Sequence, residues 1–274
     1  MIKEFRPSAI PLLPVDPYFS LWSFSDTLYS DTVRNWTGRP NTLTGTVTAD
    51  GTTFLFMGNN PTNLPVIEQT SLTIYPLRTV YTFENHALRL NVTFMTPFFP
   101  DDAALAASPV GFIFVSVSLK RCESFSVTLE AFSDMTVSEP RSRVISGTSH
   151  RSAYIGNACQ NPLSESGDNV AINWGYLHLA HPTAAITGRK SLTAHTELSE
   201  DVFVLAYDDI HSIRFMGKTL DAYYTTRFPS FSEMLKNAVV TAYLCLEKAQ
   251  KTDNAIRSEA MKLSCEYADL VSLS

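Results

Sequence analysis

The sequence lacks the short motifs that mark most catalytic and metal-binding chains. It has no G-x-S-x-G elbow, no G-x-G-x-x-G fingerprint and no Walker loop, so nothing in it indicates a nucleophilic serine or a phosphate-binding loop. Its four cysteines are scattered and form no C-x-x-C pair, which argues against a zinc site and a disulfide framework. His178 and His181 stand three apart in an expected strand and would point to opposite faces. We therefore expect no catalytic group, no metal and no cofactor in this chain.

Long apolar runs and basic clusters are also missing. No run approaches the roughly twenty apolar residues that cross a bilayer, and prolines interrupt the N-terminal segment, so we expect neither a membrane span nor a signal peptide. The 27 acidic residues outnumber the 21 basic ones, for a formal net charge of -6. Nucleic-acid binders usually carry a basic stripe, and no basic cluster here is longer than Lys120-Arg121. These observations predict a cytoplasmic chain that binds neither nucleic acid nor membrane.

What the sequence does contain is apolar alternation. Residues 88–94 alternate strictly between apolar and polar side chains, the period of a strand with one buried face. The preceding segment, 78–83, is rich in β-branched and aromatic residues, and 84–87 is a plausible hairpin loop. Residues 43–58 predict a second hairpin, in which Asp50-Gly51 supplies the positive φ that a tight primed turn needs.

Further strands follow, without helices between them. We expect a third hairpin from segments 110–119 and 124–132, joined by the charged residues 120–123. The remaining expected strands are 170–180, 184–188 and 201–207, with a Ser-, Asn- and Gly-rich surface loop at 157–169. Short polar connections imply antiparallel sheets, and this many strands exceed one ordinary sheet. The predicted fold is all-β: a large antiparallel two-sheet β-sandwich over residues 1–228, followed by two C-terminal α-helices.

Segment 229–274 is expected to form those two amphipathic linker helices. Ser230 and Glu233 fit a capping box at the start of the first helix. Asp253 can cap the second helix after a short break at Lys251 and Thr252. The apolar stripe of the second helix runs to Val271 with no recognisable stop signal. We therefore expect the helices to lead toward a further domain, and the exposed terminal helix to be able to self-associate.

Residues 17–22 read PYFSLW and residues 35–38 read NWTG. These segments resemble the PYFS-W and HWTG-like elements in the N-terminal region of the glutaminase A-like family. Asn35 thus stands at the family's His, and Met95-Thr96 precede Pro97 where the family usually has Ser-Pro. The other matching elements, in chain order, are 50–58, 79–102, 172–180, 205–217 and 267–274.

The resemblance implies an all-β N-terminal domain that is followed, in the same polypeptide, by a helical-barrel catalytic domain. It further implies that the full-length enzyme hydrolyses an amide such as the side chain of L-glutamine, giving glutamate and ammonia. This chain would then be a non-catalytic accessory and structural domain. The alternative is a carbohydrate-binding or accessory module of a glycoside hydrolase, because several of these enzymes join a sandwich to a helical barrel. Fold analogy alone does not separate the two functions.

Four carboxylates are candidates for a site in this segment. Asp101-Asp102 and Asp208-Asp209 lie just past strand ends, where loops often carry function. Acid–base and glycosidase chemistry uses such carboxylates, but an Asp at a strand exit equally serves to hold a turn. We keep both interpretations for these residues.

The three tryptophans separate into two groups. Trp22 and Trp174 stand in strand-like runs and are expected in the core. Trp36 lies in a polar loop between Arg34 and Arg39, so we expect its ring to be exposed. Trp36 and Arg34 are therefore candidates for contact with the helical domain or with a ligand.

Overall fold

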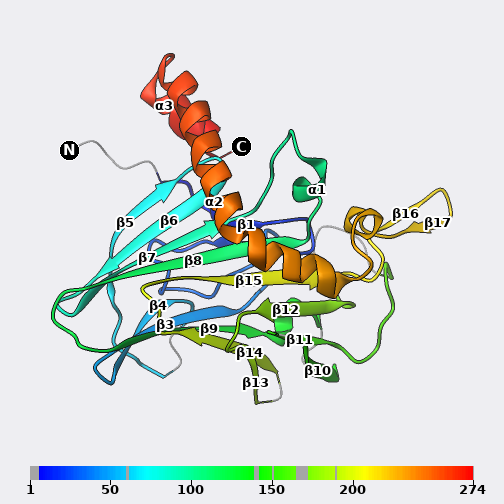
Figure 1. Ribbon diagram of the computed structural model, residues 1–274, viewed down its shortest axis with the longest axis horizontal. Coiled ribbons are helices and arrows are strands. Elements are labelled where there is room, and N and C mark those ends of the chain that lie inside the picture. Colours follow the sequence, from blue (N-terminus) through cyan, green and yellow to red (C-terminus); the bar gives the residue numbers. More distant parts are fainter. Residues whose placement is uncertain are drawn as a thin grey trace.

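The computed structural model describes residues 6–59, 62–138, 142–149, 151–164, 172–188 and 190–273. Within these ranges two antiparallel sheets lie face to face, and a long helix crosses the outer face of the larger sheet (Figure 1). The predicted all-β sandwich followed by two C-terminal helices is confirmed.

The larger sheet has eight strands in the order β10-β11-β12-β15-β8-β7-β6-β5. In chain order these are β5 (Glu68–Ile74), β6 (Arg78–Glu84), β7 (Leu88–Met95), β8 (Val110–Leu119), β10 (Val144–Ser149), β11 (Ser152–Asn157), β12 (Tyr176–Ala180) and β15 (Glu200–Asp208). The five-stranded sheet has the order β13-β14-β9-β3-β4. Its strands are β3 (Leu43–Ala49), β4 (Thr52–Met57), β9 (Phe125–Phe132), β13 (Ala185–Thr187) and β14 (Ser191–Thr196).

Two small two-stranded sheets complete the β-structure of the described residues. They pair β1 (Ile10–Pro14) with β2 (Ser20–Ser23), and β16 (Ile213–Phe215) with β17 (Lys218–Leu220). The helical elements are α1 (Ala103–Ala106), η1 (Ser133–Met135), η2 (Tyr223–Thr226), α2 (Phe231–Met261) and α3 (Cys265–Val271).

Two of the three predicted hairpins form as expected. β6 pairs with β7, and the apolar residues of β7 point into the core between the sheets. β3 pairs with β4 around Asp50 (φ 45°) and Gly51 (φ 81°), the two positive φ values of a primed turn.

The third hairpin prediction is wrong, although both of its strands exist. β8 pairs with β7 and β15 in the larger sheet, whereas β9 pairs with β3 and β14 in the smaller one. The connection between them therefore crosses the sandwich. Asp50 accepts hydrogen bonds from the backbone N–H groups of Glu123 (3.0 Å) and Ser124 (2.9 Å), which holds the start of β9 beside β3.

β8 is apolar throughout most of its length because both of its faces are buried. Ile113 and Val115 point into the core between the sheets, while Phe112 and Phe114 point toward α2. β15 alternates in the same way. These two strands thus form the middle of a three-layer arrangement of small sheet, large sheet and helix, and their period-two alternation supplies both cores.

The helices follow the prediction at their start and differ from it further along. The side chain of Ser230 accepts a hydrogen bond from the N–H of Glu233 (3.3 Å) and caps α2. No break occurs at Lys251 and Thr252, because Asp253 is a fully buried residue inside α2 and not a cap. The break comes later, where the side chain of Ser264 caps α3.

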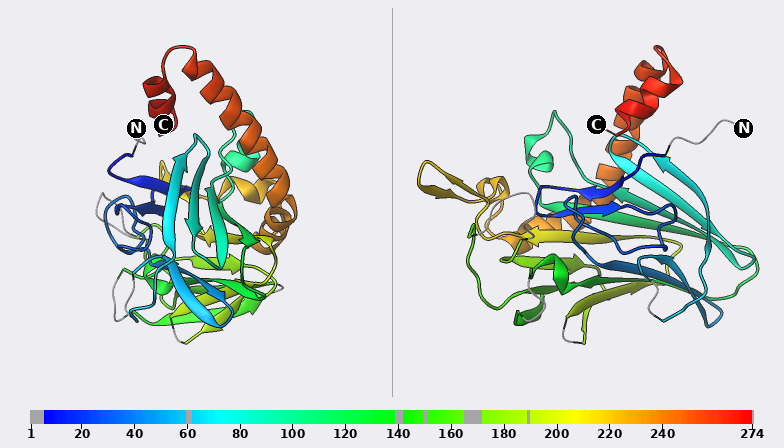
Figure 2. Two further views of the ribbon diagram at one scale, coloured as in Figure 1. Left: turned by 90° about the vertical axis from the view of Figure 1, so that its left-hand side faces the viewer. Right: turned by 180° about the vertical axis from the view of Figure 1, so that it is seen from behind.

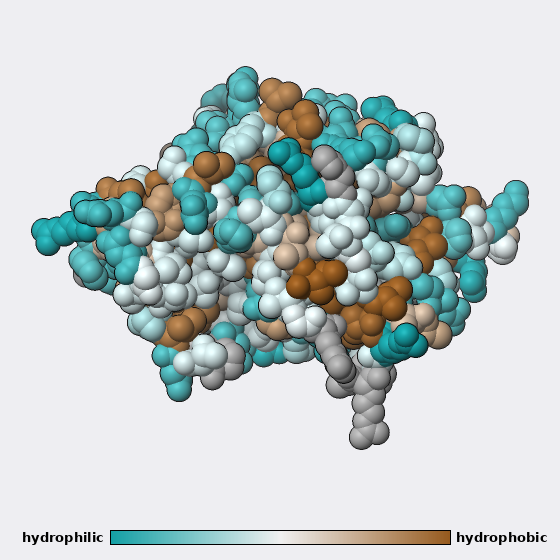
Figure 3. Space-filling view, turned by 60° about the horizontal axis from the view of Figure 1, so that its bottom comes forward, coloured by the Kyte–Doolittle hydropathy of each residue, from teal (hydrophilic) through white to brown (hydrophobic). Residues whose placement is uncertain are grey.

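α2 packs on the larger sheet from Phe231 to Asp253, and its last turns extend past the sheet, where α3 folds back beside it (Figure 2). On the face seen in Figure 3, where the bottom of Figure 1 is turned forward, apolar residues reach the surface as separate patches among hydrophilic ones. Of the predicted loop 157–169, residues 158–164 form no strand and 165–169 lie outside the described residues, as does the start of the segment 170–180.

Candidate functional site

Three carboxylates lie close together where β1 and β15 end. Asp16 follows β1, Asp208 is the last residue of β15 and Asp209 comes directly after it. The negative charges of Asp16 and Asp208 both act on the carboxyl of Asp209, and the three acids also act on the buried hydroxyl of Tyr207. Of these three residues, only Asp208 and Asp209 are predicted from the sequence as site candidates. We call Asp16, Asp208 and Asp209 the acidic cluster.

Loss of solvent raises the pKa of each member of the acidic cluster. For Asp209 burial raises the pKa to about 6, and the like charges of Asp16 and Asp208 add to the effect. Burial also raises the pKa of Asp208. Asp16 is exposed by surface area, although the protein atoms packed around its carboxyl raise its pKa against two backbone hydrogen bonds. A carboxyl that titrates near pH 6 can take up and release a proton close to neutrality.

The same carboxylates also hold turns. Asp16 Oδ1 accepts hydrogen bonds from the N–H groups of Tyr18 and Phe19, both at 2.8 Å. Asp208 Oδ1 accepts one from the N–H of Ile210 at 3.1 Å, where Ile210 has a φ of 65°. Asp208 therefore holds a turn, as one of the two interpretations of the sequence expects. A role of the acidic cluster in proton transfer remains a prediction.

Trp36 contacts the loop that carries Asp16. Its side chain is 46% exposed, as expected, and its indole Nε1 donates a hydrogen bond to the carbonyl of Pro17 at 2.8 Å. Pro17 follows Asp16 directly, so the loop of Asp16 connects Trp36 with Asp208 and Asp209. Of the other tryptophans, Trp174 is buried in the core as predicted, while Trp22 is only half-buried.

Arg34 has a structural role in the Trp36 loop. Its guanidinium donates two hydrogen bonds to the carboxylate of Asp31, both at 3.0 Å, and a third to the carbonyl of Gly38 at 3.0 Å. The hydrogen bond from Arg34 is the largest cause that lowers the pKa of Asp31. With three donors committed, Arg34 fixes the loop that presents Trp36.

Asp101 and Asp102 lie at a different place, against α2. Lys248 Nζ is 3.2 Å from Asp101 and 3.9 Å from Asp102, and it also lies over the ring of Phe99. Asp102 caps α1 by accepting from the N–H of Leu105 (3.2 Å). Asp102 and Lys248 line a pocket of ≈ 320 Å³. These acids therefore join a loop to a helix and do not meet Asp208 and Asp209 in one site.

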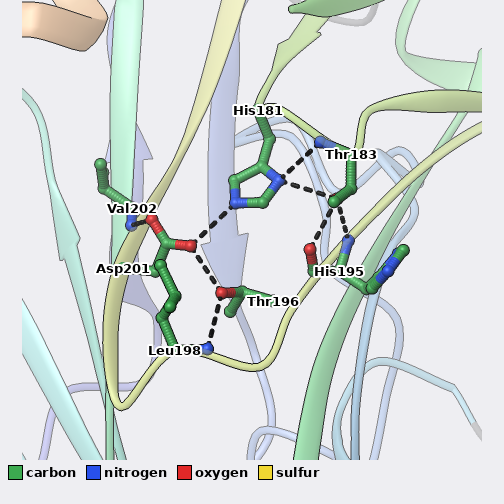
Figure 4. A network of polar contacts seen from close by, with 7 residues as sticks. All are labelled: His181, Thr183, His195, Thr196, Leu198, Asp201 and Val202. Atoms are coloured by element: carbon green, nitrogen blue, oxygen red, sulfur yellow. Dashed lines mark hydrogen bonds and ion pairs between the residues drawn. The ribbon is translucent and has the colours of Figure 1, made fainter.

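An Asp–His–hydroxyl arrangement, which the sequence did not reveal, links β12, β14 and β15 (Figure 4). His181 Nε2 is 2.9 Å from Asp201 Oδ2, and His181 Nδ1 is 2.8 Å from Thr183 Oγ1. Burial raises the pKa of Asp201, but hydrogen bonds from His181 and Thr196 outweigh it and hold the pKa below its usual value.

This arrangement is structural. The hydroxyl of Thr183 donates to the carbonyl of His195 (2.6 Å) and accepts from its N–H (2.9 Å), so it is committed to β14 (Figure 4). His181 itself is buried and stacks on Phe203 with ring centroids 4.6 Å apart. A nucleophilic hydroxyl needs freedom to approach a substrate, which these contacts remove.

Among the described residues, no group of three or more His, Cys, Asp or Glu side chains is placed to hold a metal ion. No helix in those ranges is both long and apolar enough to cross a membrane. A mainly apolar pocket of ≈ 440 Å³ lies between β1, the β5–β6 turn and the two terminal helices, and includes Trp22, Tyr75 and Phe98 in its lining. None of the site candidates from the sequence (Arg34, Trp36 and the four Asp residues) lines this apolar pocket.

The missed member of the acidic cluster, Asp16, carried no strong signal in the sequence. It stands in "PVDPYF", where an Asp between two prolines indicates a turn and nothing more. Its meeting with Asp209 depends on β1 packing against β6 and β7 of the larger sheet, a long-range placement that local patterns do not encode.

Comparison with known proteins gives two family matches to parts of the chain. The family described as "Domain of unknown function (DUF4964)" matches residues 2–69. The family described as "Domain of unknown function (DUF5127)" matches residues 77–201. The two matches follow one another along the sandwich and leave α2 and α3 uncovered.

Glutaminase A of Aspergillus oryzae (strain ATCC 42149 / RIB 40) is 26% identical to this chain over 139 residues. The match covers 48% of this chain and 20% of the relative, so it spans about a fifth of the length of that protein. Among solved structures, a putative kojibiose phosphorylase from human microbiome aligns with 90% of this chain and 35% of its own, at 10% identity and a TM-score of 0.46. Values this low support no inference about function.

Proposed function

We propose that this chain is a non-catalytic accessory domain that packs against the helical catalytic domain of a glutaminase A-like amidohydrolase. The proposal gives the sandwich a structural role, in which it positions α2 and α3 so that these helices receive the catalytic domain. The reaction of the whole protein would be hydrolysis of an amide such as the side chain of L-glutamine to glutamate and ammonia. The match to Glutaminase A, together with the order of elements that resemble its family, supports this choice of reaction.

The observation that carries the proposal is the uncovered apolar surface of the terminal helices. We call it the α2–α3 surface; its exposed residues are Val240, Tyr243, Leu244, Met261, Leu263, Tyr267 and Leu270. Val240 is 81% exposed and Leu263 73% exposed. A single exposed apolar side chain is common, but seven of them on two consecutive helices and the turn between them indicate a contact surface. Only Ala268 of α3 is buried. A short helix with so little buried area gains most of its stability from further packing.

A helical partner suits this surface. Val240 and Leu244 stand one turn apart on α2, the spacing at which side chains form a ridge that fits the groove of another helix. The polar ends of the contact are already satisfied inside the chain, because Arg257 bonds the hydroxyl of Ser272 (2.6 Å) and contacts Asp269. The part of the α2–α3 surface that stays exposed to solvent is apolar, and burying it against a second domain would lower the free energy.

Activity measurements test the proposal. Purified 1–274 should release no ammonia from L-glutamine, while the natural gene product should do so. Val240→Ser with Leu244→Ser in the natural product should lower its thermal stability and its activity. Leu198→Ser, at a comparably exposed apolar residue between β14 and β15 and away from α2, should change neither. Glutamine hydrolysis by 1–274 alone would refute the accessory role.

A carbohydrate-binding role is the second candidate, and the exposed Trp36 in contact with the loop of Asp16 is what favours it. Aromatic rings and carboxylates together can bind a sugar by stacking and hydrogen bonding. Calorimetric titration of 1–274 with oligosaccharides tests this role directly. Binding that Trp36→Ala abolishes would support it, and the absence of heat for α- and β-linked glucans would count against it.

A further inference from the structure

A second exposed apolar feature lies apart from the α2–α3 surface. Residues 211–221, which we call the arm, form the β16–β17 hairpin that projects from the body of the molecule (Figures 1 and 2). Among the described strands, β16 and β17 pair only with each other. A lone two-stranded hairpin is marginally stable in water, so its residues should be those that favour a free turn and a polar surface.

The side chains of the arm contradict that expectation. The register pairs Ile213 with Leu220 and Phe215 with Lys218, so these four residues share one face. All four are exposed, and Phe215 is 58% exposed. Three of the four are large apolar residues. Cross-strand contact between Ile213 and Leu220 stabilises the hairpin only slightly, and a partner that covers this face would bury more of its apolar area.

The turn of the arm gives the same indication. Met216 (φ 46°) and Gly217 (φ 77°) occupy the two central positions of a primed turn. Asn, Asp or Gly is preferred at the first of these positions, and a long side chain with positive φ carries backbone strain. Met216 is nevertheless placed there, 87% exposed at the tip. A flexible thioether side chain is well suited to fill a gap in a contact surface.

Charge is distributed unevenly along the arm. Arg214 and Lys218 lie toward the tip, while Asp208, Asp209 and Asp221 lie at the base. His211 bridges the base by pairing with Asp221 at 2.6 Å. The tip is thus basic and the base acidic. Two such arms placed antiparallel, tip over base, are complementary in charge as well as in apolar surface.

We propose that the arm is a self-association surface, on which two copies of this chain stack their arms antiparallel across a two-fold axis. Phe215 and Met216 of each copy then cover the Ile213–Leu220 pair of the other, and Lys218 lies over the acidic base of the second copy. The contact is isologous, so it closes at a dimer. It is independent of the proposed catalytic domain, because it uses no residue of the α2–α3 surface.

The dimer should be weak. A few side chains on each arm bury far less than the ~1,600 Å² of a standard interface. A dissociation constant on the order of 10–100 μM is therefore expected, and it should rise with salt because part of the attraction joins exposed charges.

Sedimentation velocity of 1–274 over a concentration series tests the proposal. Wild-type protein should form a dimer, and Phe215→Ser with Leu220→Ser should remove it without changing the circular dichroism or the Tm, since neither side chain reaches the core. Val240→Ser with Leu244→Ser is the matched control on α2 and should leave the dimer intact. Lys218→Glu should weaken the dimer at least ten-fold.

Three results would overturn the proposal. If the wild-type protein stays monomeric at ~1 mM, well above the expected dissociation constant, the arm does not mediate self-association. The arm would then be a contact surface for another partner, such as the catalytic domain. A dimer that the α2 variant dissociates, and the arm variant does not, assigns self-association to the terminal helices. If the Lys218→Glu variant dimerises with the same dissociation constant as the wild type, the antiparallel tip-over-base arrangement is wrong.

Discussion

At the scale of single residues, the buried pair of Arg78 and Asp253 joins α2 to the sandwich. Arg78 Nε is 2.7 Å from Asp253 Oδ2, and the N–H of Leu77 donates to Asp253 Oδ1 at 2.9 Å. Asp253 is fully buried. Burial raises its pKa even against the hydrogen bond from Arg78, so the pair costs desolvation that its attraction only partly offsets.

Removing one partner of this pair should therefore lower the free energy of unfolding far more than replacing both partners with apolar residues. Asp253→Ala leaves Arg78 charged and buried, and should lower the free energy of unfolding by about 3 kcal/mol. The double variant Asp253→Leu with Arg78→Met should recover most of that loss. Urea unfolding measures both, with Glu247→Ala on the exposed side of α2 as the control. Equal losses for the single and double variants would contradict this account.

His178 should make the fold sensitive to acid. It lies between the sheet and the start of α2, with its ring 4.6 Å from that of Phe231, and burial lowers its pKa to about 4. In the unfolded chain its pKa returns to about 6.5. Between these values the unfolded state binds a proton at His178 that the folded state does not, so the contribution of His178 to stability falls as the pH drops from 6.5 to 4. The raised pKa of Asp209 acts in the opposite sense over part of this window.

The loss across that window is at most ~3 kcal/mol. His178→Leu should remove this loss, so that its unfolding free energy falls less than that of the wild type as the pH drops from 6.5 to 4. His86→Gln, at an exposed position, should behave like the wild type. Chemical denaturation at a series of pH values measures this. An unchanged slope in His178→Leu would show that other groups dominate the window.

At the scale of elements, α2 depends on its cap. Ser230→Ala removes the acceptor for the N–H of Glu233 and should cost about 1 kcal/mol. Ser232→Ala, one position inside the helix and exposed, should stay within ~0.5 kcal/mol of the wild type. Thermal unfolding of the two variants compares them. A smaller loss in Ser230→Ala than in Ser232→Ala would mean that packing alone fixes the start of α2.

The elements also show what local sequence encodes. The alternation of β7, the Asp50-Gly51 turn and the cap at Ser230 are predictable because neighbours along the chain decide them. The pairing of β8 and β9 is not, because it depends on Asp50 holding Glu123 and Ser124 from another hairpin. The cap predicted at Asp253 is wrong for a similar reason, since its partner, Arg78, lies 175 positions away.

At the scale of the whole molecule, the candidate carboxylates separate into two places. Asp101 and Asp102 join a loop to α2 through Lys248, whereas Asp208 and Asp209 meet Asp16 at the end of the sandwich. The sequence predicts the exposure of Trp36 but not its contact with the loop of Asp16, because that contact joins two separate loops of the fold. The arm and the α2–α3 surface are two large apolar features that the fold leaves to solvent.

Hydrogen–deuterium exchange of α3 in the natural gene product and in isolated 1–274 is the most direct measurement of the central claim. A seven-residue helix with one buried side chain should exchange rapidly when free, and slowly when a second domain covers it. We predict strong protection of residues 265–271 in the natural product and little in 1–274. Equal exchange in both would contradict docking on the α2–α3 surface, and with it the accessory role.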